Sequence, residues 1–153
     1  MRPDSASERW RSDVSRLREI SPRHILFMCV ANSARSQMAE GLARSMAPPS
    51  VQISSAGSAP TFVHPLSIEV LAEIGIDIAE YTSKGLESID TGSIDAVITL
   101  CEREVCPTFP GSVCRVHWAL PDPGVAALEA GGALEGFRTV RDTLRERLAL
   151  LFR

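Results

Sequence analysis

The chain has 153 residues, enough for one domain with a sizeable core, and its 44% hydrophobic and 23% charged residues are ordinary for a globular protein. A net charge of -3 argues against nucleic acid as an obligatory partner, and the sequence contains neither an apolar run of membrane-spanning length nor a signal peptide. We therefore expect a cytoplasmic protein without a membrane partner, whose four cysteines serve catalysis or redox chemistry rather than a disulfide framework.

The first 22 residues are rich in Arg and Ser and contain no recognisable catalytic motif. Trp10, Val14 and Leu17 recur at helical spacing after Ser7, which can serve as an N-cap, so a short amphipathic helix is one prediction. A disordered tail is the alternative. We expect residues 1–22 to be an N-terminal extension and residues 23–153 to form the single folded domain.

Residues 24–46 have the pattern of a buried strand, a loop of small residues and a helix. The apolar run 25–28 is typical of a buried parallel strand and ends at Cys29, and a helical pattern begins at Ser36. A strand end, a loop and a helix N-terminus aim backbone N–H groups and the positive end of the helix dipole at one point, which favours an anion. We therefore predict an anion-binding loop made of Val30, Ala31, Asn32, Ser33, Ala34, Arg35 and Ser36.

Cys29 is the candidate nucleophile of this loop, because the converging N–H groups should stabilise its thiolate. Arg35 can bind an oxyanion through two parallel hydrogen bonds. Ser36 can donate a hydrogen bond to the thiolate, and Asn32 tolerates the left-handed backbone that a tight loop often needs. The alternative is a buried, inert cysteine at a strand end. The C-x5-R spacing, joined to this strand and this helix, favours catalysis.

The remaining chain predicts strands over 51–57, 96–100 and 113–116 and helices over 65–75 and 134–152. Right-handed crossovers make the strands parallel, so their C-terminal ends should meet at the edge that contains Cys29. The predicted fold is a single-domain, doubly wound α/β protein with a mostly parallel four-stranded sheet and helices on both faces. His64, in the loop after residue 57, is interpreted as a surface histidine before a proline.

Cys101 and Cys106 lie on a polar segment that begins where a predicted strand ends. Two thiols on such a segment can exchange disulfides, because each attack needs only one sulfur to move into line. Cys114 is a rival for the second thiol, although a small apolar residue within a strand is the simpler interpretation. These three cysteines and His117 could also bind zinc, but Cys114 and His117 should point to opposite faces of a strand, and there is no C-x2-C motif. We expect no metal site.

Asp122, between Pro121 and Pro123, is the candidate general acid, because flanking prolines restrict its backbone and a proton donor must be held near the anion. A turn aspartate is the alternative.

Together these segments resemble a known family. Residues 29–40, CVANSARSQMAE, are similar to the signature of low-molecular-weight protein tyrosine phosphatases and of the arsenate reductases that share their fold, and SQMAE is closer to the reductases. The resemblance extends to the C-terminus through SSAG (54–57), EIGIDI (73–78), VITLC (97–101), HW (117–118), PDP (121–123) and FRTVRD (137–142).

The resemblance implies reduction of arsenate to arsenite in arsenic detoxification. It assigns the nucleophile to Cys29, the general acid to Asp122, and the two following thiols of a disulfide relay to Cys101 and Cys106. The final reductant would be thioredoxin, glutaredoxin or a low-molecular-weight thiol. The C-x4-C spacing of the last two cysteines is shorter than in the thioredoxin-coupled members.

The same resemblance implies no organic cofactor, although some reductases of this fold hold a structural potassium ion at positions matching Asn32, Glu40 and Ser55. The alternative activity is hydrolysis of phosphomonoesters by a tyrosine phosphatase. Against it, Gly124 stands where the phosphatases usually have an aromatic residue, and Cys101 would have no role. A catalytically silent anion-binding module is a third hypothesis.

Overall fold

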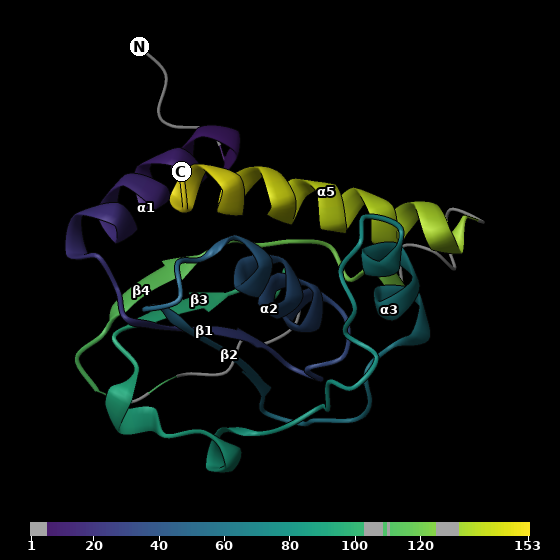
Figure 1. Ribbon diagram of the computed structural model, residues 1–153, viewed down its shortest axis with the longest axis horizontal. Helices are drawn as coiled ribbons and strands as arrows, with labels where there is room; N and C mark the ends of the chain where they lie inside the picture. The colour runs from purple at the N-terminus through teal and green to yellow at the C-terminus, as the bar shows by residue number, and fades with distance from the viewer. Residues whose placement is uncertain (1–5, 103–108, 110, 125–131) are drawn as a thin grey trace.

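The computed structural model describes residues 6–102, 109, 111–124 and 132–153 (Figure 1). Its strands pair in parallel in the order β2-β1-β3-β4, which confirms the predicted α/β fold. The strands are β1 (His24–Cys29), β2 (Gln52–Gly57), β3 (Ala96–Thr99) and β4 (Cys114–His117). The α-helices are α1 (Ala6–Ile20), α2 (Arg35–Met46), α3 (Pro65–Ala72) and α5 (Ala133–Leu151), and two 3-10 helices are η1 (Leu86–Ser88) and η2 (Thr91–Ser93).

The strand register brings the C-terminal ends of the strands to one edge of the sheet. Cys29 lies opposite Gly57 of β2, and Met28 lies opposite Thr99 of β3. At the other edge, the Asp95 carboxylate accepts hydrogen bonds from the backbone N–H groups of Arg23 and His24. This contact holds the start of β1 beside the start of β3. The last residues of the two strands therefore also lie side by side, near the predicted nucleophile.

The two faces of the sheet bury separate clusters. Ile25 and Phe27 of β1 belong to the larger cluster, which also contains the inward residues of α1, α2, α3 and α5. Leu26 and Met28 point into a smaller cluster with Val97 and Phe109, packed against residues of the segment that contains η1. Helical turns therefore cover both faces, but unequally, as Figure 1 shows: the α-helices on one face and the one-turn helices on the other.

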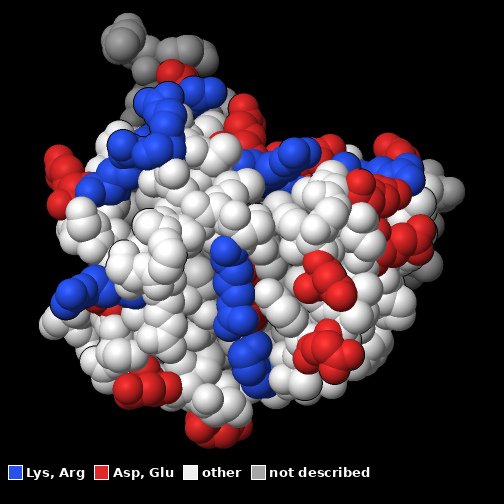
Figure 2. Space-filling view, viewed as in Figure 1, with Lys and Arg blue, Asp and Glu red and all other residues white. Residues whose placement is uncertain are grey.

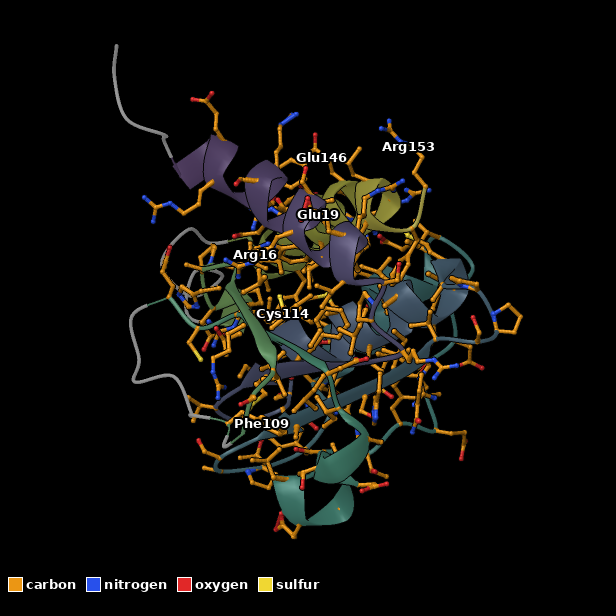
Figure 3. The ribbon with its side chains drawn as sticks, turned by 90° about the vertical axis from the view of Figure 1, so that its left-hand side faces the viewer. Arg16, Glu19, Phe109, Cys114, Glu146 and Arg153 are labelled. Carbon is orange, nitrogen blue, oxygen red and sulfur yellow. The ribbon has the colours of Figure 1, made fainter. Side chains whose placement is uncertain are left out.

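Helix α1 packs on the domain through the residues that its spacing predicted. Trp10, Val14 and Leu17 are buried in the larger cluster. The Arg147 guanidinium of α5 lies 5.3 Å from the ring centroid of Trp10. Arg16 reaches from α1 toward β4 and donates a hydrogen bond to the backbone carbonyl of Arg115 (Figure 3).

The surface mixes both signs of charge. Arginine side chains gather over α1, with acidic residues among them, on the face shown in Figure 2. No helix within the described parts of the chain is long and apolar enough to cross a membrane.

Helices α3 and α5 are joined by an ionic cluster that should make stability depend on pH. The Glu73 carboxylate accepts hydrogen bonds from Arg138 (2.6 Å from Nη2) and Arg141 (2.7 Å from Nη1). Hydrogen bonds from Arg138, and then from Arg141, lower the pKa of Glu73 from 4.5 to about 2. A carboxyl whose pKa is lower in the folded state stabilises the fold above its unfolded pKa, and this contribution disappears as the pH falls.

We therefore expect Glu73→Gln to lower the melting temperature at pH 7. Between pH 4.5 and pH 2 the melting temperature of this variant should fall less steeply than that of the parent. Thermal melts from pH 7 to pH 2 measure both effects, with Glu69→Gln, one turn earlier in α3, as the control. Because the cluster is partly exposed, high salt should weaken the effect. Parallel pH profiles for the parent and Glu73→Gln would contradict this interpretation.

Candidate active site

The predicted anion-binding loop joins the end of β1 to the start of α2. Cys29 is buried, and its Sγ lies 2.9 Å from Ser36 Oγ, the contact that the sequence predicted. Asn32 has φ of +48°, as predicted for this tight loop. A side chain at Gly57 would not fit, because a Cβ there would lie 2.3 Å from the Val30 carbonyl oxygen. The last residue of β2 therefore has to be glycine for the loop to lie against it.

The chain after β2 lies alongside this loop and orients its peptide groups. The N–H groups of Ala59, Thr61 and His64 donate to the carbonyls of Val30, Ala31 and Ser33 at 2.9, 3.2 and 3.1 Å. In a trans peptide the N–H of the next residue points opposite to the carbonyl. The N–H groups that follow these three carbonyls, on residues 31, 32 and 34, are therefore directed away from the neighbouring segment.

A cavity of about 240 Å³ opens beside Cys29. Four of the seven predicted loop residues line it, together with residues from the segment after β2 and the segment after β4. Asn32 and Ser36 are instead fully buried, where they hydrogen-bond to each other at 2.7 Å. The lining residues are Cys29, Ala31, Ser33, Ala34, Arg35, Thr61, His64, Asp122 and Gly124.

Arg35 connects the loop to the segments that follow β3 and β4. Its side chain is buried, and Nη1 donates to the backbone carbonyls of Leu120 at 3.0 Å and Leu100 at 3.4 Å. Nη2 lies 3.9 Å from Oδ2 of Asp122. A guanidinium held in this way keeps a fixed orientation beside the cavity, where its charge favours an anion.

Asp122 lies at the rim of the same cavity, as the sequence predicted. Its side chain is 46% exposed, and Oδ1 accepts a hydrogen bond from the Gly124 N–H at 3.0 Å. The bond to Gly124 orients the carboxyl, while its exposure allows exchange of a proton with water. This placement suits a general acid.

Cys101 is buried at the same edge of the sheet as Cys29. It follows Leu100, whose N–H donates to the Met28 carbonyl at 2.9 Å, next to the nucleophile in sequence. The structure therefore brings the first two predicted relay thiols to neighbouring strand ends. The third, Cys106, lies outside the described residues.

Cys114 lies at the opposite end of the sheet. It begins β4 and pairs with Ala96, the first residue of β3. Three residues of strand, roughly 10 Å, separate Ala96 from Thr99 near the Cys29 edge. Figure 3 shows Cys114 on β4 on the side near Arg16. This register argues against Cys114 as a relay thiol.

His64 is more than the surface histidine that the sequence predicted. The side chain is half-buried and lines the cavity, and Nδ1 accepts a hydrogen bond from the Leu66 N–H at 3.1 Å, which caps α3. The ring packs on Phe137 with 4.6 Å between centroids. Burial lowers the pKa of His64, and the charge of Asp122 opposes this. The position directly before Pro65 is a typical N-cap position and could have suggested the cap, but no local signal indicates the cavity.

Within the described residues, no three His, Cys, Asp or Glu side chains gather in a way that could hold a metal ion. His117 instead pairs with Thr99, with 2.7 Å between Nδ1 and Oγ1.

The chain is similar to known proteins over most of its length. The family model described as low molecular weight phosphotyrosine protein phosphatase matches residues 24–153. An arsenate reductase of Halalkalibacterium halodurans is 38% identical over 81% of this chain and 91% of its own length. A glutaredoxin arsenate reductase of Synechocystis is 37% identical over 82% and 93%. A solved arsenate reductase in the phosphate binding state, 36% identical, superposes with a TM-score of 0.72 over 85% of this chain and 96% of that one.

Proposed function

Because this chain belongs to the low-molecular-weight phosphotyrosine protein phosphatase family and matches its arsenate reductases over most of their length, we propose that it reduces arsenate to arsenite. The observation that supports this best is the second buried thiol, Cys101, beside the end of β1 that contains Cys29. Phosphoester hydrolysis has no use for that thiol, whereas the proposed reduction uses it to displace arsenite from Cys29.

The first step joins arsenate to the enzyme. Arsenate is a tetrahedral dianion at neutral pH, and the loop N–H groups and Arg35 match its charge and shape. The Cys29 thiolate attacks arsenic and forms a sulfur–arsenic bond. An arsenic–oxygen bond breaks, and Asp122 gives its proton to the leaving oxygen, which departs as water. Ser36, 2.9 Å from the sulfur, stabilises the thiolate before attack.

The second step transfers electrons. The Cys101 thiolate attacks the Cys29 sulfur, a Cys29–Cys101 disulfide forms, and the electron pair of the sulfur–arsenic bond stays on arsenic. Arsenic is thereby reduced from As(V) to As(III) and leaves as arsenite, while two thiols are oxidised. Cys106 then attacks Cys101 and releases the Cys29 thiolate.

An external thiol reduces the final disulfide. Thioredoxin, glutaredoxin and low-molecular-weight thiols can all perform this exchange. The similarity to a glutaredoxin arsenate reductase supports testing glutaredoxin beside thioredoxin. The enzyme would act in the cytoplasm, in arsenic detoxification, where such reductants keep thiols reduced.

Phosphomonoester hydrolysis is the second candidate, because its first step uses the same thiolate, anion-binding loop and acid. The rim of the cavity argues against it. Gly124 lines the cavity directly after Asp122 and Pro123, so this position offers no aromatic surface for a substrate ring.

A paired assay tests the proposal. We expect arsenate-dependent consumption of NADPH with a coupled thioredoxin or glutaredoxin system, with arsenite as product, and only slow hydrolysis of an aryl phosphate. The same enzyme preparation should be assayed with both substrates at matched concentrations. Fast phosphate release without arsenite formation under any reductant would assign the chain to the phosphatases instead.

A further inference from the structure

Lys84 places its ammonium group in the polar cluster beneath the anion-binding loop. Its Nζ lies 3.3 Å from each of three acceptors: Oε1 of Glu40, Oγ of Ser55 and the backbone carbonyl of Thr82. An ammonium has three N–H donors, so each donor has an acceptor. The side chain is 22% exposed and Glu40 is 3% exposed, which makes this a largely desolvated ion pair.

The backbone of Lys84 is anchored at the same place. Its N–H donates to Asn32 Oδ1 at 2.9 Å, and its carbonyl accepts from the Gly57 N–H at 2.9 Å. Lys84 is also the only lysine in the chain, which otherwise uses arginine as its strongly basic residue. A lysine provides a compact point charge that a planar guanidinium cannot reproduce.

The hydrogen bonds of this cluster have a fixed direction. Ser55 donates its single hydroxyl proton to Glu40 Oε1 at 2.5 Å, so its lone pairs accept from Lys84 Nζ and from Asn32 Nδ2 at 3.0 Å. The second Asn32 N–H goes to Ser36 Oγ at 2.7 Å. Ser36 is thus an acceptor from Asn32, and its own proton remains for the Cys29 sulfur at 2.9 Å. The chain of bonds runs from the ammonium to the nucleophile.

A potassium ion does not fit these residues. Two of the positions that the family resemblance assigned to potassium, Glu40 and Ser55, already face the Lys84 ammonium. Glu40 is also paired with Arg44, 2.7 Å from Nη2 to Oε2, so its one negative charge faces two cations. A further monovalent cation would be repelled by these two cations. Both carboxylate oxygens of Glu40 already have partners.

We propose that Lys84 is a covalently attached replacement for the monovalent cation, and that it positions Cys29 through Ser55, Asn32 and Ser36. The protein therefore needs no potassium for stability or for reactivity of its nucleophile. Lys84 is a positioning residue, because it acts on Cys29 only through the other three side chains.

Two measurements test this, and neither uses arsenate, so their outcome is independent of the proposed reaction. The parent should melt at the same temperature in KCl and in tetramethylammonium chloride of equal ionic strength, since the larger cation cannot enter a cluster of this size. Lys84→Asp removes the ammonium and adds an oxygen ligand, so its melting temperature should rise in KCl by about 3 °C or more. Arg44→Gln is the matched control: it removes a cation from Glu40 but keeps Lys84, and should show no response to potassium.

The second measurement is the rate at which iodoacetamide alkylates Cys29 at pH 7, followed by peptide mass spectrometry. We expect Lys84→Met to alkylate Cys29 severalfold more slowly than the parent, and potassium to restore the rate in Lys84→Asp but not in Lys84→Met. A parent protein that potassium stabilises, or a folded Lys84→Asp that ignores potassium, would overturn the proposal. An unchanged alkylation rate in Lys84→Met would remove the link to Cys29. The parent comparison decides the potassium question even if a variant does not fold.

Discussion

Replacement of Cys29 by serine should abolish arsenate reduction, with arsenite formation reduced by on the order of a thousandfold or more. A serine hydroxyl stays protonated in this loop and cannot form the disulfide that follows. The substitution is nearly isosteric, and Ser36 can still hydrogen-bond to the new oxygen across the 2.9 Å contact. The fold and anion binding should therefore persist, which thermal melts and phosphate titration by calorimetry would verify.

Cys114→Ser is the matched control for this experiment, because Cys114 lies at the opposite end of the sheet, paired with Ala96. It should retain the parent rate of arsenite formation. Residual reduction by Cys29→Ser above a trace would remove Cys29 from the role of nucleophile. A loss of activity in Cys114→Ser would show that Cys114 takes part in reduction although it lies at the other end of the sheet from Cys29.

Cys101→Ser should form the arsenic adduct on Cys29 but release no arsenite, because no second thiol attacks the Cys29 sulfur. Hydrolysis of an aryl phosphate should survive in this variant, since it uses water rather than a thiol. A rapid-quench experiment that counts arsenite per enzyme, run beside the phosphatase assay, separates the two steps. Catalytic turnover by Cys101→Ser would mean that an external thiol attacks the adduct itself.

The local features of this site could be predicted from sequence because they depend on neighbouring residues. The apolar run of β1 and the helical pattern of α2 follow from short-range spacing, and together they place Cys29, Asn32 and Ser36. The edge shared by Cys29 and Cys101 follows from the handedness of parallel crossovers, which leaves few topologies for such a chain.

The features that escaped prediction depend on contacts between distant segments. His64 reaches the cavity only because three backbone hydrogen bonds hold its loop along the anion-binding loop. Lys84 lies between α3 and η1 in a segment without regular structure, so nothing in its local sequence indicated that its ammonium would face Glu40. The position of Cys114 required the register of β4, which a short strand pattern does not specify.

Disulfide mapping by peptide mass spectrometry tests the proposed relay most directly. The parent and Cys106→Ser would each receive a single addition of arsenate without reductant and then be alkylated and digested. The proposal predicts a Cys101–Cys106 disulfide in the parent and a Cys29–Cys101 disulfide in Cys106→Ser. Alkylation of all four cysteines of the parent after arsenate, or a parent disulfide between Cys101 and Cys114, would contradict it.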